Sequence, residues 1–112
     1  MRLAIIGSRG LTINNIAEYI PCGVDEIVSG GAKGVDFCAA EYARVNGIKL
    51  TEFLPEYSRY GRAAPLKRNE EIAKYADEAI VFWDGRSRGT KYTIEVFEKL
   101  KKRVTLVLID NA

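Results

Sequence analysis

The sequence predicts an α/β fold: a Rossmann-like three-layer sandwich with helices on both faces of a five-stranded parallel sheet. Two observations carry this prediction. Five short apolar runs alternate with segments of helical spacing along the 112 residues, a pattern typical of repeated strand–helix units. Several runs also lack polar alternation, as strands covered on both faces do. With right-handed crossovers we expect the strand order 3-2-1-4-5 in a single domain over residues 1–112.

The five expected strands are apolar runs that each end at a turn. They cover Leu3–Ile6, Glu26–Val28, Ile48–Phe53, Glu78–Trp83 and Val104–Ile109. The third run is partly polar, so we expect it at an edge of the sheet. In the order 3-2-1-4-5 the carboxyl ends of strands one, two and four are neighbours. Ligands bind at such a switch point in open α/β sheets.

The four expected helices lie between the strands. Their inward faces are formed by Ile13, Ile16, Ala17 and Ile20; by Val35, Cys38, Ala39 and Tyr42; by Leu66, Ile72, Ala73 and Ala76; and by Thr93, Ile94, Phe97 and Leu100. Each set has the spacing of one helix face. Thr12 or Asn15 should cap the first helix and Pro21 should end it, whereas Pro65 should begin the third. The connection Leu54–Pro65 is expected to be irregular, and its length is typical of a functional loop.

Composition excludes several classes of protein. The net charge of +2, from 17 basic and 15 acidic residues, is too balanced for a typical nucleic-acid binder. No apolar stretch approaches the roughly 20 residues of a membrane span, and the N-terminus runs into a strand rather than a signal peptide. We therefore expect a cytoplasmic protein without a membrane partner. The two cysteines form no CxxC pair and histidine is absent, so we expect neither a metal site nor a required cofactor.

Three glycine-containing turns follow strands one, two and four. They are Gly7-Ser8-Arg9-Gly10, the stretch Ser29–Asp36, and the stretch Asp84–Thr90. Glycine lets a ligand approach the backbone, and the first turn of a helix offers N–H groups that favour an anion, most often a phosphate. We expect these turns to form the three walls of one pocket, which Arg68 and Asn69 of the third helix could face if the loop before that helix folds over the rim. The candidate ligand-binding residues are Gly7, Ser8, Arg9, Ser29, Gly30, Gly31, Lys33, Gly34, Asp36, Arg68, Asn69, Asp84, Gly85, Ser87, Gly89 and Thr90.

Each candidate also has a purely structural interpretation. An acid such as Asp36 in a first helical turn is stabilised by the helix dipole, and Asp84 followed by glycine is an ordinary turn. Arg68 could face the ligand if the loop before it folds over the rim. Tyr57 and Tyr60 could stack on a base or simply pack the loop. Neither the GxGxxG fingerprint nor the GxxxxGK[ST] motif is present.

Several motifs occur in a fixed order over almost the whole chain. They are Gly7-Ser8-Arg9, Ser29–Asp36, Pro55, Arg68-Asn69, Ala76-Asp77, and Phe82–Gly85 with Ser87, Gly89 and Thr90. In this order and spacing they resemble the SLOG superfamily, and more closely its small YpsA-related branch of DUF2493 type. The resemblance implies a Rossmann-like fold that binds a nucleotide or nucleotide-derived ligand at this rim. It also implies a homodimer, since the superfamily often dimerises.

One departure from the superfamily bears on catalysis. Its LOG phosphoribohydrolases carry a PGGxGTxxE motif, whose glutamate helps cleave the N-glycosidic bond. Here the matching turn begins Asp84-Gly85, and Thr93 stands three residues after Thr90. The catalytic glutamate therefore has no counterpart, although Asp84 or Asp36 could take its place. Whether the chain is an enzyme stays open at this point.

Three functions follow as hypotheses. The leading one is a sensor or carrier module that binds a nucleotide or nucleotide derivative through its phosphate. The second is a hydrolase of the nucleotide N-glycosidic bond that uses Asp84 or Asp36. The third, a single-strand nucleic-acid binder, is disfavoured because such proteins use a basic groove and this chain has a net charge of only +2.

Overall fold

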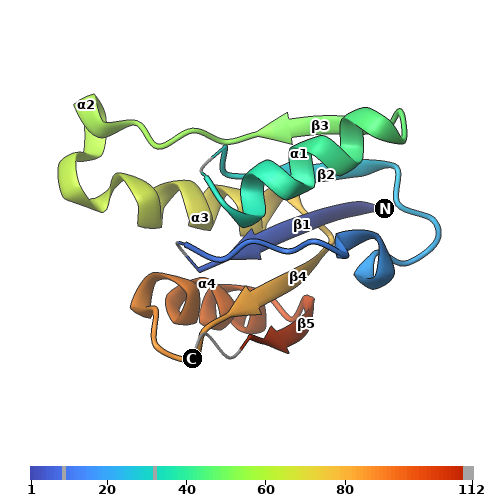
Figure 1. The fold of residues 1–112 in the computed structure, drawn as a ribbon. Helices are drawn as coiled ribbons and strands as arrows, with labels where there is room; N and C mark the ends of the chain where they lie inside the picture. Colours follow the sequence, from blue (N-terminus) through green and yellow to red (C-terminus); the bar gives the residue numbers. More distant parts are fainter. Residues whose placement is uncertain (9, 32, 110–112) are drawn as a thin grey trace.

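The sheet has the predicted topology. The computed structural model describes residues 1–8, 10–31 and 33–109 (Figure 1). Its strands are β1 (Arg2–Gly7), β2 (Glu26–Ser29), β3 (Lys49–Glu52), β4 (Glu78–Trp83) and β5 (Arg103–Leu108). They form one parallel sheet in the order β3-β2-β1-β4-β5. The expected α/β class, strand order and edge position of the third strand are therefore confirmed.

Helices cover both faces of this sheet, which gives the three expected layers (Figure 1). The helices are α1 (Val35–Val45), the one-turn α2 (Tyr57–Tyr60), α3 (Ala64–Tyr75) and α4 (Arg88–Lys99), with two 3₁₀ turns, η1 (Ile16–Tyr19) and η2 (Gly61–Ala63). Residues of α1 and η1 pack on one face, and residues of α3 and α4 pack on the other. No helix in the described part of the chain is long and apolar enough to cross a membrane.

The core is divided between the two faces by the alternation of the central strands. In β1, Leu3 and Ile5 pack with the α1 layer, whereas Ala4 and Ile6 pack with the α3–α4 layer. The same alternation holds in β4, where Phe82 faces α1 and is fully buried. Because both faces are covered, the central strands are continuous apolar runs in the sequence.

The first predicted helix is wrong. In place of a helix with Ile13, Ile16, Ala17 and Ile20 on one face, the chain forms only the 3₁₀ turn η1. Leu11, Ile13 and Ile16 are nevertheless buried, at 2%, 7% and 8% exposure. Asn15 precedes η1 without capping it, and its amide instead donates to Glu18 Oε2 at 2.8 Å. β-Branched residues favour extended backbone, and burial in the core outweighs the helical spacing of this segment.

The loop after β3 also differs from the expectation. The segment predicted to be irregular between Leu54 and Pro65 contains α2 and η2, and α3 begins at Ala64 with Pro65 in its first turn. Three consecutive helical pieces thus lead from β3 to the far face of the sheet. They bring the first turns of α3 to the carboxyl end of β2, where Arg68 meets Gly30.

Candidate functional site

A cavity of about 280 Å³ lies at the carboxyl end of the sheet, where the first turns of α1, α3 and α4 meet. Its lining residues are Ile6, Gly7, Gly30, Lys33, Asp36, Arg68, Asn69, Ile72, Ser87, Gly89 and Thr90. All three glycine-containing turns therefore contribute to one cavity, together with α3. Ile6 and Ile72 were not predicted for the site, because in the sequence they are indistinguishable from other core positions.

The remaining predicted residues do not line this cavity. Ser8, Ser29, Gly31, Gly34, Asp84 and Gly85 are absent from the described residues around it. Arg9 lies outside the residues that the structure describes. The cavity is thus lined by fewer residues than the sequence predicts, and some of the other predicted residues shape the turns around it.

The first turn of α4 gathers hydroxyl groups at the cavity. Ser87 is the N-cap of α4, and its hydroxyl accepts a hydrogen bond from the backbone N–H of Thr90. The Thr90 hydroxyl lies 3.1 Å from the Ser87 hydroxyl and 3.3 Å from that of Ser8. With Gly89 between them, Ser87 and Thr90 present hydroxyl groups beside the positive end of the helix dipole. That arrangement favours an anion.

Asp84 shapes this turn from behind. Its Oδ1 accepts hydrogen bonds from the backbone N–H groups of Ser87 and Arg86, both at 2.8 Å, and from the Ser8 hydroxyl at 3.4 Å. The bonds from Ser87 and Arg86 lower the pKa of the Asp84 carboxyl group. A carboxylate held in this way fixes the backbone that leads into α4. Asp84 is therefore placed as a support of the turn, outside the lining of the cavity.

Arg68 ties α3 to the turn after β2. Its Nη1 donates to the carbonyl of Gly30 at 2.6 Å and to that of Phe53 at 3.4 Å, and its Nε donates to Asn69 Oδ1 at 2.7 Å. A Cβ on Gly30 would lie only 2.4 Å from Nη1. The absence of a side chain at this position therefore leaves room for the guanidinium group to pass beside the turn. Burial lowers the pKa of Arg68, and the negative charge of Asp36 opposes that effect.

A second polar chain ties α3 to α4. Asn69 Nδ2 donates to Thr93 Oγ1 at 2.8 Å, and the Thr93 hydroxyl donates to the carbonyl of Gly89 at 2.9 Å. Thr93 is fully buried. Thr93 thus supplies a neutral side chain that braces the first turn of α4. The sequence placed Thr93 on the inward helix face and, through the resemblance, opposite the LOG glutamate, but it did not predict this bracing role.

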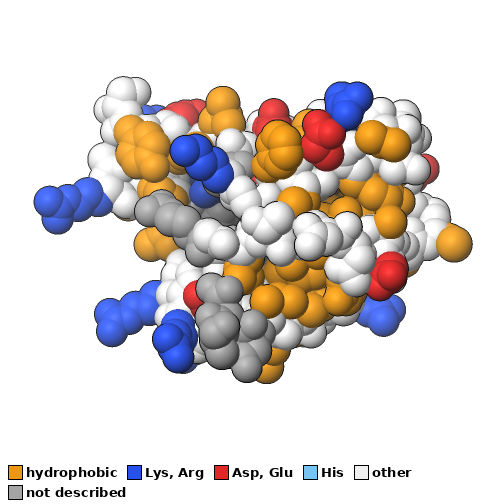
Figure 2. Space-filling view, in the orientation of Figure 1, with side chains coloured by type: hydrophobic (Ala, Val, Ile, Leu, Met, Phe, Trp, Pro, Cys, Tyr) orange, Lys and Arg blue, Asp and Glu red, His pale blue; other side chains and the backbone are white. Residues whose placement is uncertain are grey.

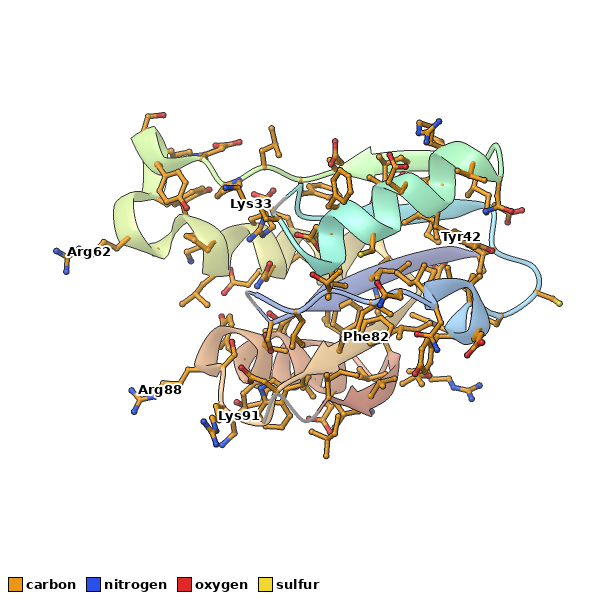
Figure 3. All side chains as sticks on the ribbon, viewed as in Figure 1. Lys33, Tyr42, Arg62, Phe82, Arg88 and Lys91 are labelled. Carbon is orange, nitrogen blue, oxygen red and sulfur yellow. The ribbon has the colours of Figure 1, made fainter. Side chains whose placement is uncertain are left out.

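The charge at this end of the molecule is mostly positive. Lys33 and Arg68 line the cavity with one carboxylate, that of Asp36, among its described lining residues. Lys and Arg side chains project around the same end of the sheet (Figure 2), and Arg62 and Arg88 are among them (Figure 3). A net charge of +2 conceals this local excess. It adds to the attraction for anions and gives little of the continuous basic groove that a nucleic acid needs.

Tyr57 and Tyr60 are the aromatic residues that the sequence offered for stacking, and the charge of the Tyr57 phenol acts on the pKa of Arg68 at the cavity. Tyr57 is 58% exposed, and the ring of Tyr60 lies 5.0 Å from the guanidinium of Arg59. Neither is among the described residues that line the cavity. Within residues 1–8, 10–31 and 33–109, no three His, Cys, Asp or Glu side chains come together as a metal site.

Comparisons with protein-family models, with curated proteins and with solved structures found no match for this chain.

Proposed function

We propose that this domain binds a nucleotide or nucleotide derivative through its phosphate, as a sensor or carrier. The observation that carries the proposal is the meeting of Ser87, Gly89 and Thr90 with Lys33 and Arg68 around one cavity. A helix N-terminus with hydroxyl groups and nearby cations matches the chemistry of a phosphate. The backbone of this turn is held by Asp84 before any ligand arrives, so little ordering is needed on binding.

The size of the cavity favours a small ligand. Pockets for drug-sized ligands measure about 300–1,000 Å³, and this cavity of about 280 Å³ is just below that range. A phosphate with an attached pentose is of the right scale, whereas a dinucleotide would extend far outside it. We therefore propose a mononucleotide-type ligand. Asp36, in the first turn of α1, can accept hydrogen bonds from the sugar hydroxyl groups.

A hydrolase of the N-glycosidic bond is the alternative, and Asp36 is the specific observation in its favour. It is a carboxylate that lines the cavity, as a residue acting on water or on the ribose would have to. Against this alternative, Thr93 stands at the position of the LOG glutamate, and Asp84 is engaged by two backbone N–H groups. Release of free base from a nucleoside 5′-monophosphate, abolished in Asp36→Asn, would establish the enzyme and displace the sensor or carrier.

We also propose membership of the SLOG superfamily. The support is that four of its matching motifs contribute to one cavity, through residues such as Gly7, Lys33, Asn69 and Thr90. The two unpaired cysteines, Cys22 and Cys38, are in keeping with a proposed cytoplasmic location.

The proposal includes a homodimer, and β5 supports it. This edge strand of six residues pairs with β4, and no other described strand pairs with it. Its single charged residue is Arg103, and Leu106 and Leu108 are 45% and 65% exposed. Proteins normally protect an edge with charges or short strands, as β3 does here with Lys49 and Glu52. Antiparallel pairing of two β5 strands would continue the sheet across a two-fold axis.

Calorimetric titration of the protein with the common nucleoside 5′-monophosphates, ribose 5-phosphate and inorganic phosphate tests the binding proposal. We expect Lys33→Ala and Thr90→Val each to weaken phosphate-containing ligands about tenfold, which corresponds to one charge-assisted hydrogen bond. Lys99→Ala is the matched control, because it removes the same charge at the far end of α4. Equal effects of the two lysine substitutions, or no binding of any of these ligands, would contradict the proposed site.

A further inference from the structure

We infer that the base of the bound nucleotide stacks on Phe37, in a second cavity that adjoins the phosphate cavity at Lys33. This inference rests on the proposed function and extends it from the phosphate to the base. The second cavity measures about 330 Å³, and its lining residues are Thr12, Gly31, Lys33, Gly34, Phe37 and Cys38. Lys33 lines both cavities. A ligand whose phosphate lies on one side of Lys33 therefore has space for its other end on the opposite side.

The sequence of α1 places its two functional side chains one residue apart. Asp36 lines the phosphate cavity and Phe37 lines the second cavity. Both belong to the first turn of α1, whose buried residues Val35, Ala39 and Ala43 face the sheet. The helix thus directs a carboxylate to one cavity and an aromatic ring to the next. A nucleotide needs this order of contacts: phosphate, then sugar hydroxyl groups, then base.

Phe37 is otherwise an unexplained side chain. It is 62% exposed, although a phenylalanine ring carries a large apolar area that is usually buried. The walls of the second cavity are mainly apolar, and Thr12 and Lys33 are the polar side chains among its described lining residues. A flat ring with polar edges fits these walls. Stacking on an aromatic side chain accepts any of the common bases, because each has a π-face.

The described residues that line this second cavity favour a small planar group over a protein partner. A docked helix or strand would lie in the larger apolar cavity of about 580 Å³ that Phe37 shares with Tyr42 and Val45 along α1, and Lys33 is not among the described residues that line it. A nucleotide instead pairs the Lys33 ammonium group with its own phosphate. Figure 3 places Lys33 beside the N-terminal end of α1, between that helix and α3, where it can serve both cavities.

The test compares a nucleotide with its own sugar phosphate. Wild-type protein, Phe37→Ala, Phe37→Trp and Tyr57→Ala are titrated with ribose 5-phosphate and with whichever common nucleoside 5′-monophosphate binds most tightly. We expect Phe37→Ala to weaken the nucleotide by about 5- to 150-fold, the loss of one stacked base, and to leave ribose 5-phosphate unchanged. Phe37→Trp should retain nucleotide affinity. Tyr57→Ala removes a similarly exposed ring outside both cavities. Because Tyr57 acts electrostatically on Arg68 at the phosphate cavity, this change should affect both ligands alike and leave the difference between them unchanged.

The outcomes separate this inference from the proposed function. Equal weakening of both ligands by Phe37→Ala, or loss of nucleotide affinity in Tyr57→Ala alone, would overturn the stacking role while the phosphate site stands. If wild-type protein binds neither a nucleotide nor ribose 5-phosphate, both proposals are refuted. Because the Phe37 side chain is largely exposed, its removal should leave the unfolding temperature unchanged, and a thermal melt of each variant verifies that the binding data come from folded protein.

Discussion

The close packing around Gly7 matters to both the sheet and the ligand cavity, because there is no room for a side chain at this position. A Cβ at this position would lie 2.2 Å from Val35 Cγ2 and 2.4 Å from Val35 Cβ. Val35 is 1% exposed in the first turn of α1, so its side chain has no free space to enter. Gly7 is not among the glycines with positive φ. The Gly7→Ala substitution should therefore act through packing and leave backbone strain out of the result.

The expected magnitudes come from this one contact. Forcing a methyl group into a filled core costs about 1–3 kcal/mol. Val35→Ala removes two buried carbon atoms, worth about 1.6 kcal/mol at 0.8 kcal/mol each, and a small cavity raises the loss to about 2 kcal/mol. Independent sites would lose about 3–5 kcal/mol together. Val35→Ala removes Cγ1 and Cγ2 but keeps the Cβ, which lies 2.4 Å from the added methyl group. The double variant therefore relieves part of the clash, and we expect its loss to fall below this sum by more than about 0.5 kcal/mol.

Guanidinium chloride unfolding of the four proteins measures this coupling, with m-values that should agree because the surface exposed on unfolding is nearly constant. Gly89→Ala is the control: it is the same substitution in the first turn of α4, with no atom within 4 Å of the new Cβ. It should leave stability unchanged or raise it by up to about 1 kcal/mol. If the losses of Gly7→Ala and Val35→Ala add to within about 0.5 kcal/mol, the packing explanation is refuted.

Three further predictions concern the turn, acid stability and the edge strand. Asp84→Asn keeps an acceptor oxygen for the backbone N–H groups, so titration should show phosphate binding retained in Asp84→Asn and lost in Asp84→Ala; equal loss in both would point to a direct role of the charge. A hydrogen bond from the Tyr75 phenol lowers the pKa of Glu26 below its ordinary 4.5. The Glu26 carboxylate therefore stabilises the folded protein above that pH, and this contribution is lost as pH falls through the folded pKa. Thermal melts between about pH 6 and pH 3 should therefore fall more steeply for the wild type than for Glu26→Gln, and parallel curves would contradict this. Leu108→Lys should convert a dimer into a monomer in light scattering, and a monomeric wild-type protein would contradict pairing through β5.

The sheet could be predicted from the sequence because its central strands are covered on both faces and are therefore apolar throughout. Leu3–Ile6 has no polar alternation, and both of its faces are covered. The first helix could not be predicted in the same way. Ile13 and Ile16 are spaced three apart, which suits a helix face. Both side chains are buried, yet the segment that carries them forms only the turn η1. The spacing of apolar residues predicts which side chains are buried, but it does not determine whether their backbone forms a helix or a turn.

The site was predictable to the level of its turns, and the roles inside each turn were not. Glycines and hydroxyl residues located the cavity, but Asp84 and Asp36 are equivalent as letters in a sequence. Their difference depends on partners that are close only after folding: Asp84 Oδ1 meets Ser8, 76 positions away. Phe37, the residue that we propose for base stacking, was missed for a related reason. It lies off the buried face of its helix, which is a signal of exposure, and exposure indicates a ligand only once a cavity is known beside it.

The polar side chains at the carboxyl end of the sheet divide into those that hold the backbone and those that line the cavity. Asp84 and Thr93 bond mainly to the turn that leads into α4, whereas Lys33 and Thr90 face the space where a phosphate would lie. Arg68 serves both purposes, since Nη1 and Nε are engaged by protein oxygen atoms while its guanidinium also lines the cavity. Replacing a residue that holds the backbone should therefore lower ligand affinity by moving the turn that leads into α4. A conservative substitution that keeps the hydrogen bond should restore this affinity. Replacing a lining residue removes a direct contact, which no substitution that merely preserves the fold can restore.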